Sequence, residues 1–483
     1  MFKKLILQSG IYSLGTIYGF VIGFFIKIYL IHKIGVGAFG EYMVGQTFLN
    51  TILTIISLAL PTLLVKYLTK FLSKDKKLLA YNLFNFSLFY TIIVGLIAIF
   101  LTIIFNKQLV FIFKNHSEVL KNILVISSFY IPFILLREIF YSSFRAILKV
   151  KEIVIYGSFI YITLRALLIL IVFYFTSNVL YLLYIEIFSL MLTDFLLFFN
   201  IKKIFKIFIP KIFLLKLNKE MIKYWEKMYI YALIGFIGGY VINWELSIFL
   251  PPKYLGIYSI LLTLAGLSAF IITNVAKIFS SVIVKLVSEK QYEELKKVYK
   301  DTTFIISFLT FLLIIFLAIF KKDLLLLYSK ELIEYKNIFI ILLFGYLINA
   351  FVGNSGLLLL FGGGENKEVL IRILNLIFTL IISLIFVKYF GLIGAIITFT
   401  LRLVFINLLQ VIFVYKFFHF LPWNKENLIM FFITDLIIIG SVFIDNFTLL
   451  NKLFIFFIIF LLYIGFFYKK LKFMYSYIKG QRK

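Results

Sequence analysis

The sequence of 483 residues contains no cysteine. The chain therefore has no disulfide framework and no thiolate metal or redox site. Its three histidines, His32, His116 and His419, lie far apart and do not have the spacing of metal ligands. Acidic residues are also few, with 22 Asp and Glu against 49 Lys and Arg. These residue types predict no bound metal and no cofactor.

Charged residues of either sign make up only 15% of the chain, whereas a soluble globular protein has about 25%. Hydrophobic residues make up 63%, and the mean hydropathy is +1.07. A single soluble core could not bury so much apolar surface. We therefore expect an all-α polytopic membrane protein, with the bilayer as its solvent.

Apolar runs indicate how often the chain crosses the bilayer, because a spanning helix needs about 20 such residues. The first run follows Lys3-Lys4, is longer than a signal peptide requires and shows no small-residue cleavage site, so we expect an uncleaved span. The runs predict 14 transmembrane helices, at about 5–30, 42–65, 79–105, 119–143, 153–175, 179–200, 228–250, 257–283, 302–320, 337–360, 369–387, 391–415, 427–444 and 451–468.

The basic residues are distributed unevenly between the two sides of the membrane. With 14 spans both ends lie on one side, and that side carries 33 of the 49 Lys and Arg, against about eleven on the other. By the positive-inside rule the N- and C-termini are cytoplasmic, as expected for a multi-pass protein of the plasma (inner) membrane. Basic charge between apolar runs is a topology signal, so we expect no nucleic acid partner.

The sequence resembles itself at an offset of 216 residues. Three sets of residues superpose: Gly19 and Gly23 on Gly235 and Gly239, Gly40-Glu41-Tyr42 on Gly256-Ile257-Tyr258, and Lys151-Glu152 on Lys367-Glu368. The repeat predicts two pseudo-symmetric six-helix lobes of one orientation, which would hold a substrate between them. The expected division is a lobe at 1–200, a basic cytoplasmic loop at 201–227, a lobe at 228–416, and two C-terminal helices with a basic tail at 417–483.

Glycines also recur within the first span. Gly15, Gly19 and Gly23 lie four residues apart and form one stripe. Small-residue stripes let helices approach closely in a membrane. Both static packing and a sliding surface are compatible with this pattern.

Five cations lie inside the predicted spans. Arg137, Arg165 and Arg402 are deep, whereas Lys27 and Lys277 are nearer to span ends. Because a charge at bilayer depth is costly, such residues usually face a bundle interior or a wet cavity. We expect all five to bind substrate as cavity cations, and a diphosphate is the natural partner of a guanidinium. The alternative is that each arginine pairs with a carboxylate and holds helices together.

Carboxylates inside the spans are candidates for a gate or for ion coupling. These are Glu138, Glu186 and Glu245. Tyr240 and Asn243 fall on one face of the seventh span and are expected to be polar groups of the cavity. Glu245 points about 200° away from Asn243 on a helix of ~100° per residue. It could therefore bridge to the other lobe, bind a coupling cation or snorkel to the surface.

Three motifs carry a resemblance to a known family. They are "GVGAFGEY" at 35–42, "PPKYLGIYS" at 251–259 and "YFGLIGAI" at 389–396. In their order and placement they resemble the Wzx-type oligosaccharide flippases of the MOP exporter superfamily. The resemblance implies two lobes around a central cavity and transport of a polyprenyl-diphosphate-linked oligosaccharide to the outer leaflet. Where many members have an Asp-Arg pair, this sequence has Asn243-Trp244-Glu245.

The resulting hypothesis is a non-enzymatic flippase for surface polysaccharide assembly that works by alternating access. Its expected partners are the lipid-linked oligosaccharide, the bilayer, glycosyltransferases and a glycan polymerase. A cation-coupled multidrug exporter and a peptidoglycan-precursor flippase of the same superfamily are the alternatives. A membrane glycan polymerase or glycosyltransferase is a third class, but such enzymes usually need a sizeable external loop. The predicted external segments are at most about sixteen residues long.

Overall fold

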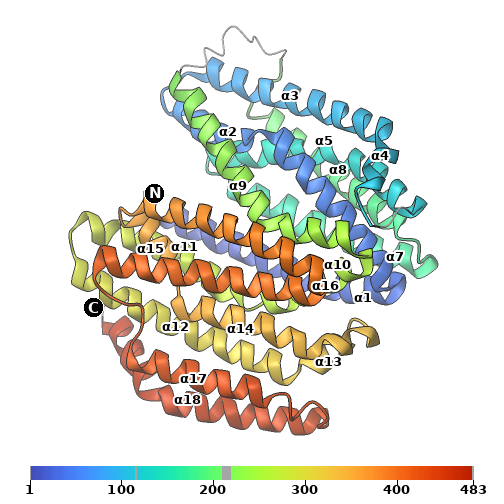
Figure 1. Cartoon of the computed structure of the whole chain (residues 1–483). Coiled ribbons are helices and arrows are strands. Elements are labelled where there is room, and N and C mark those ends of the chain that lie inside the picture. The colour runs from blue at the N-terminus through green and yellow to red at the C-terminus, as the bar shows by residue number, and fades with distance from the viewer. Residues whose placement is uncertain (1, 115–116, 209–218, 481–483) are drawn as a thin grey trace. The chain divides into compact units, whose positions relative to one another are not determined.

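The structure is a computed structural model of the chain, and it describes residues 2–114, 117–208 and 219–480. Every regular element in these ranges is a helix (Figure 1), which confirms the all-helical class. The chain forms two compact units, unit 1 from Met1 to Gly256 and unit 2 from Ile257 to Lys483. Residues 209–218 of the predicted loop 201–227 lie outside the described ranges.

Within the described residues, unit 1 contains ten helical elements and the start of another. Helix α10, Pro252–Gly266, begins in unit 1 and continues into unit 2. The elements before it are α1 Phe2–Ser57, α2 Leu60–Ser73, α3 Lys77–Ile104, α4 Asn106–Phe111, α5 Glu118–Ala146, α6 Val150–Ile153, the π-helix η1 Val154–Ile160, α7 Tyr161–Phe175, α8 Leu180–Lys202 and α9 Lys219–Phe249.

Unit 2 contains the remaining elements, including the two C-terminal helices. They are α11 Ala269–Ser288, α12 Tyr292–Ile319, α13 Lys321–Leu326, the 3₁₀-helix η3 Lys330–Tyr335, α14 Lys336–Val352, α15 Ser355–Phe361, α16 Glu365–Phe418, α17 Lys425–Gly440 and α18 Leu449–Gly480.

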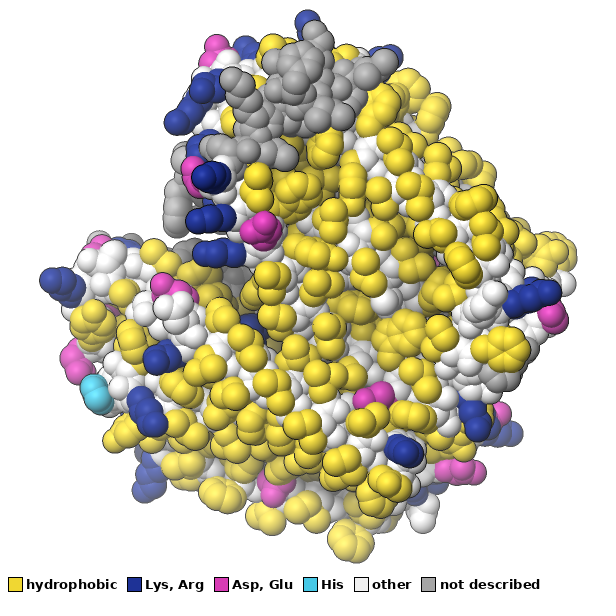
Figure 2. Space-filling view, turned by 45° about the horizontal axis from the view of Figure 1, so that its top comes forward, with side chains coloured by type: hydrophobic (Ala, Val, Ile, Leu, Met, Phe, Trp, Pro, Cys, Tyr) yellow, Lys and Arg dark blue, Asp and Glu magenta, His cyan; other side chains and the backbone are white. Residues whose placement is uncertain are grey.

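Many of these helices can cross a bilayer. Within the described residues, ten are long and apolar enough, or eleven if the bent pair α10 and α11 forms one span. Large hydrophobic side chains are exposed along them, and Figure 2 shows such side chains over most of one face. The chain is a multi-pass membrane protein.

The count of ten or eleven differs from the predicted 14 for identifiable reasons. Helices α1 and α16 each count once, although each is interrupted by a glycine with non-helical dihedral angles, Gly35 (φ 79°) and Gly391 (φ 57°). A straight helix of the 54 residues of α16 would be about 80 Å long, far more than the ~30 Å hydrocarbon layer. Helix α17 has only 16 residues.

The end of the predicted second span also differs. Helix α1 ends at Ser57, and Leu58 and Ala59 have positive φ angles of 48° and 52°. Helix α2 then starts with Pro61 in its first turn. Proline is tolerated there because the backbone N–H groups of the first turn have no partner within the helix. The predicted span 42–65 is therefore divided, and its last residues belong to a separate amphipathic helix.

Ion pairs within the units join segments that were predicted to lie on the same side of the membrane. Lys70 of α2 lies 3.6 Å from Glu220 of α9, in two predicted cytoplasmic segments. Lys470 of α18 lies 3.0 Å from Asp301 of α12, again on the predicted cytoplasmic side. Lys452, at the predicted external end of the last span, lies 2.6 Å from Asp323, which was predicted to be external. These pairs are compatible with the predicted topology, which stays a prediction, and the cytoplasmic assignment rests on the charge count.

Helix α5 forms the centre of unit 1 and packs against α1, α2, α3 and α8. Its contact with α3 is close, because a Cβ built on Gly95 would lie 2.8 Å from the Pro132 side chain. Its buried residues include Ser127, Ser128, Ser142 and Ser143. Small residues permit this close approach of helices, as expected inside a membrane.

Two of the three glycines of the first-span stripe lie in close helix contacts. A Cβ built on Gly15 would lie 2.7 Å from Val154, and one on Gly19 would lie 2.7 Å from Ile162. Both contacts are side chains of the η1–α7 segment. Gly23 has open space around its Cβ position. Two of the three glycines therefore serve close packing.

Two glycines of the predicted repeat contact each other in unit 1. A Cβ on Gly40 would overlap the carbonyl of Pro252, and a Cβ on Gly256 would lie 2.7 Å from the carbonyl oxygen of Val36. Gly256 and Pro252 are the residues 216 positions after Gly40 and Val36. Each of the two segments thus approaches the backbone of the other, at positions related by the 216-residue offset.

Candidate functional site: a buried ionic network in unit 1

The first half of the network is centred on the Glu186 carboxylate of α8, which is 4% exposed. Arg165 of α7 donates to its Oε1 from Nη2 at 2.5 Å and from Nε at 3.1 Å. The Tyr42 hydroxyl donates to the same oxygen at 2.7 Å, and Gln46 Nε2 donates to Oε2 at 3.3 Å. Four hydrogen bonds thus satisfy one buried carboxylate, as a charge away from water requires.

The second half pairs Arg137 of α5 with Asp194 of α8. Arg137 Nε donates to Asp194 Oδ1 at 2.7 Å, and its Nη2 donates to the carbonyl of Leu190 and to the Thr193 hydroxyl. Both side chains are almost fully buried, with 9% and 6% exposed. Breaking such a pair by removing one partner typically costs about 3–5 kcal/mol, because the other charge stays buried.

Two tyrosines connect the halves. The Arg137 guanidinium stacks over the Tyr161 ring, 4.3 Å from its centroid. The Tyr161 hydroxyl lies 3.0 Å from the Tyr130 hydroxyl of α5. Tyr161 and Arg165 are four residues apart on α7, so one helical face presents both side chains. The network therefore contains two ion pairs, one on each side of a hydroxyl pair.

Of the predicted site residues, three lie in this network: Arg137, Arg165 and Glu186. Both arginines are paired with carboxylates, which is the alternative that the sequence left open. Arg165 is the more accessible, with 26% of its side chain exposed against 9% for Arg137. A ligand in contact with this network would therefore meet Arg165 first.

No role was predicted from the sequence for six side chains of the network: Tyr42, Gln46, Tyr130, Tyr161, Thr193 and Asp194. A signal existed for Tyr42, which belongs to the motif "GVGAFGEY", and for Tyr161, which precedes Arg165 by one helical turn. Asp194 follows Glu186 at i+8 on the same helix, inside a predicted span. Nothing in the sequence distinguishes Tyr130 from the other tyrosines.

Other predicted residues of unit 1 lie in different surroundings. Glu138 pairs with Arg145 at 3.6 Å, and both side chains are over 40% exposed, so this carboxylate belongs to the surface of α5. The Lys27 ammonium lies over the Phe39 ring, 5.1 Å from its centroid. The Tyr240 ring stacks on Phe236 at 4.7 Å.

The stretch 243–245 near the end of α9 is anchored within unit 1. Trp244 Nε1 donates to the Thr51 hydroxyl at 2.9 Å, and its ring stacks on Phe113. The Asn243 carbonyl accepts a hydrogen bond from Ser247, and Glu245 is 7% exposed. The gate and coupling roles of Glu245 stay predictions.

The remaining two predicted cations belong to unit 2. The Arg402 guanidinium of α16 stacks over Phe399, 5.1 Å from its centroid. Lys277 lies on α11, but its side chain is outside the described part of the structure. Among described residues, no group of three or more His, Asp or Glu could hold a metal ion.

Solved structures with the same fold are transporters and a flippase. The chain aligns with "Lipid II flippase MurJ, inward closed conformation" at TM-score 0.73 and 16% identity, over 95% of this chain and 99% of the other. It aligns with an inward-facing multidrug resistance MATE family transporter of the MOP superfamily at 0.68 and 14%, over 84% and 94%. A MOP superfamily transporter from Pyrococcus furiosus aligns at 0.60 and 15%, over 85% and 95%.

At these identities the likeness establishes the fold, which is that of MOP superfamily transporters. No protein-family model matches the sequence, and no curated protein matches it either. The predicted fold is confirmed, and both membership of the superfamily and the Wzx-type assignment stay predictions.

Proposed function

We propose that this protein is a flippase that moves a polyprenyl-diphosphate-linked oligosaccharide from the cytoplasmic to the outer leaflet by alternating access. The MOP fold supports a transport role, and the alignment with a lipid flippase extends over 95% of the chain. We propose 14 spans, obtained by dividing α1 at Gly35 and α16 at Gly391, counting α10 and α11 as one, and adding α17. We also propose the two six-helix lobes, the cytoplasmic termini and the inner-membrane location that the sequence predicts.

The observation that carries the proposal is Arg165 in the membrane-spanning part of unit 1. A guanidinium has five N–H donors, and its bonds to Glu186 use two of them. The remaining donors suit a diphosphate, which guanidinium groups bind in bidentate fashion. In this proposal Arg137, nearly enclosed by Asp194 and Thr193, orients the network rather than touching the lipid head group. Arg402, Lys27 and Lys277 remain proposed cavity cations.

Two other transport functions have support of their own. The buried Glu186 carboxylate, surrounded by Tyr42, Gln46 and Arg165, is the kind of group that a cation-coupled multidrug exporter requires. The alignment with a lipid II flippase favours a peptidoglycan-precursor lipid, which would present the same diphosphate. We propose transport rather than catalysis, with glycosyltransferases and a glycan polymerase as partners that supply and consume the substrate.

Cells that lack the protein are expected to lose outer-leaflet exposure of a lipid-linked oligosaccharide, which should accumulate in the inner leaflet. The measurement is labelling of the glycan by a membrane-impermeant reagent before and after lysis. Accumulation of lipid II instead would support the peptidoglycan alternative, and drug sensitivity with normal glycolipid exposure would support the exporter. Normal exposure of every lipid-linked glycan would refute a flippase role.

Replacing Arg165 by glutamine is expected to lower transport by at least about tenfold, because a charge-assisted hydrogen bond contributes about 1.5–3 kcal/mol. Lysine should restore only part of the activity, since it lacks the bidentate geometry. The matched control is Arg145→Gln, which removes an exposed ion pair worth at most about 1 kcal/mol and should leave transport nearly unchanged.

The single substitution also leaves Glu186 buried without its cation, so stability must be separated from binding. The double variant Arg165→Gln/Glu186→Gln removes both charges and should recover most of the thermal stability. We expect its transport to stay low. If transport returns together with stability, Arg165 holds helices together and does not contact the substrate.

A further inference from the structure

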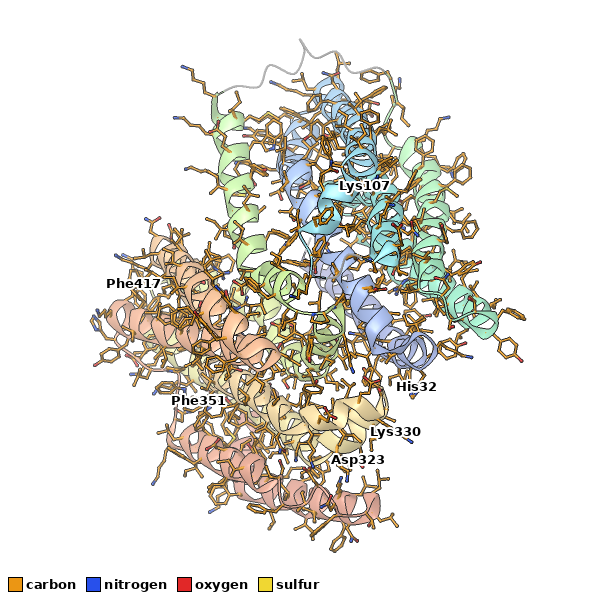
Figure 3. The ribbon with its side chains drawn as sticks, turned by 45° about the vertical axis from the view of Figure 1, so that its right-hand side comes forward. His32, Lys107, Asp323, Lys330, Phe351 and Phe417 are labelled. Carbon is orange, nitrogen blue, oxygen red and sulfur yellow. The ribbon has the colours of Figure 1, made fainter. Side chains whose placement is uncertain are left out.

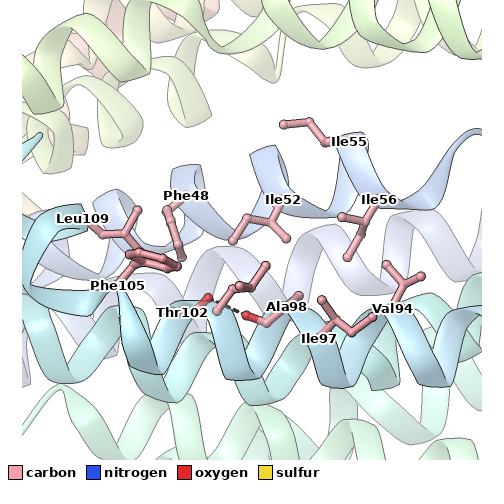
Figure 4. Close-up of a pocket in the computed structure, with 11 residues that line it drawn as sticks. Phe48, Ile52, Ile55, Ile56, Val94, Ile97, Ala98, Thr102, Phe105 and Leu109 are labelled. Atoms are coloured by element: carbon pink, nitrogen blue, oxygen red, sulfur yellow. Dashed lines mark hydrogen bonds between the residues drawn. The ribbon is translucent and has the colours of Figure 1, made fainter.

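Unit 1 contains an elongated hollow between the second segment of α1 and the helices α3 and α4. Its volume is about 380 Å³, and we refer to it as the α1–α3 slot. Several of the lining side chains face one another across the slot (Figure 4). The lining consists of Phe48, Ile52, Ile55, Ile56, Val94, Ile97, Ala98, Leu101, Thr102, Phe105 and Leu109.

The slot results from the way α3 packs. Gly95 brings α3 against Pro132 of α5, whereas α3 and α1 contact each other at few positions. The floor is the small side chain of Ala98, which belongs to a buried cluster with Leu49, Leu53, Ile131 and Leu135. A larger residue at position 98 would occupy the space. The hollow is therefore specified by a small residue at one position.

The lining excludes a polar ligand. Ten of its eleven residues are apolar, and the eleventh, Thr102, donates its hydroxyl hydrogen to the Ala98 carbonyl at 2.8 Å. Sites for polar ligands contain a few polar groups that fix orientation. Apolar hollows stay dry and take hydrocarbon. A sugar, a nucleotide or an ion would lose its hydration here without compensation.

The opening and the length of the slot fit a lipid chain. Ile55, Ile97 and Phe105 are each 49% exposed, so the slot opens sideways from helices that are long and apolar enough to span the membrane. From Val94 to Phe105 the slot follows α3 for about 16 Å, at 1.5 Å per residue. This is about half of the ~30 Å hydrocarbon thickness, the depth of one leaflet.

The polar end of the slot is basic. Helix α4 starts directly after Phe105 and carries the exposed Lys107 (Figure 3), and Lys114 follows the helix and is also exposed. The described stretch 101–114 contains no Asp or Glu. Basic residues at a membrane surface attract anionic lipid head groups.

The geometry points to a resident lipid: the α1–α3 slot binds one acyl chain of an anionic phospholipid, with the head group near Lys107. The lipid lies in the leaflet on the α4 side, which is the outer leaflet in the predicted orientation. The assignment is independent of what the protein transports. It gives unit 1 a specific lipid site in addition to the ionic network.

The test uses the full-length protein in nanodiscs that contain phosphatidylglycerol with a photoreactive diazirine near the end of one acyl chain. Crosslinked residues are located by mass spectrometry, with unlabelled phosphatidylglycerol or polyprenyl phosphate as competitor. Ala98→Leu fills the slot from α3, and Ile52→Phe fills it from α1. If one of these variants misfolds, the other still tests the site. Leu96→Phe is the matched control, because Leu96 is 58% exposed on α3 and does not line the slot.

We expect saturable crosslinks at slot residues, and unlabelled phosphatidylglycerol should compete them away. Both filling variants should reduce these crosslinks by about tenfold, whereas Leu96→Phe should leave them unchanged. Replacing Lys107 and Lys114 by glutamine should reduce the preference for phosphatidylglycerol over phosphatidylcholine. Non-saturable crosslinks equal to those around Leu96 would overturn the site. Displacement by polyprenyl phosphate but not by phospholipid would overturn the assigned occupant.

Discussion

Alanine in place of Gly40 is expected to destabilise the protein by at least about 2 kcal/mol, although alanine is normally the better helix former. The added Cβ would overlap the backbone carbonyl of Pro252. A backbone atom cannot rotate away as the end of a side chain can, so α1 and α10 must separate locally. The measurement is thermal unfolding of the purified protein in one detergent.

The same chain provides a matched control three residues earlier. Gly37 lies on the same segment of α1, is exposed, and has nothing within 4 Å of its Cβ position. Gly37→Ala should be neutral or stabilising by up to about 1 kcal/mol, because it gains helix propensity without a clash. Equal stabilities for Gly37→Ala and Gly40→Ala would contradict the contact.

A double-mutant cycle tests the reciprocal nature of the contact. Gly256→Ala alone should also destabilise, because its Cβ would lie 2.7 Å from the carbonyl oxygen of Val36. If the two glycines face each other, the first alanine already separates the helices. The double variant should then cost less than the sum of the single changes, by about 0.5–3 kcal/mol. Additive costs would mean that the two sites are independent.

The sequence predicted this contact only indirectly, through the repeat. The 216-residue offset identified Gly40 and Gly256 as equivalent positions, but apolar periodicity has no information on which helices meet. The same limit applies to the ionic network. Depth within a span singled out Arg137 and Arg165, whereas their partners Asp194 and Glu186 lie on another helix, 57 and 21 residues away. Hydropathy indicates how deep a residue lies in the membrane, whereas its ion-pair partner can be identified only once the packing of the helices is known.

Helix breaks were the other feature that hydropathy misplaced. A loop was expected between the first two spans, but a single residue, Gly35, interrupts α1. Its positive φ is accessible to glycine without strain, so one residue suffices to change direction. The break at Leu58 and Ala59 had no glycine to signal it. Apolar runs therefore predicted the existence of spans far better than the positions of their ends.

Replacing Asp445 by asparagine is expected to cost about 3–5 kcal/mol, because it leaves the buried Lys321 ammonium without its counter-ion. Asp445 lies between α17 and α18 and is 4% exposed. It pairs with Lys321 at 2.6 Å and with Lys336 at 2.9 Å, and Lys321 is fully buried. The Lys321 ammonium also donates to the Ser441 carbonyl at 2.8 Å, which attaches the α17–α18 hairpin to α13. Thermal unfolding in detergent measures the loss.

Two comparisons isolate the charge from the shape. Glu293→Gln removes an exposed pair with Lys296 and should cost at most about 1 kcal/mol. The double variant Lys321→Met/Asp445→Leu removes both buried charges and should recover most of the stability, as in other buried ion pairs. Failure of this double variant to recover would mean that packing around the hairpin, and not the unpaired ammonium, accounts for the loss.

The pH dependence of stability gives an independent test of the same carboxylate. Burial would raise the pKa of Asp445, but hydrogen bonds from Lys321 and Lys336 hold that pKa below its ordinary value of 3.8. A depressed carboxyl pKa contributes stability that is complete above the unfolded value and is lost as the pH falls through the folded one. The wild-type protein should therefore keep its hairpin contribution down to about pH 4 and lose it in stronger acid. Asp445→Asn should lack that step, because its side chain has no proton to gain, and an unchanged acid transition in this variant would exclude Asp445 as its source.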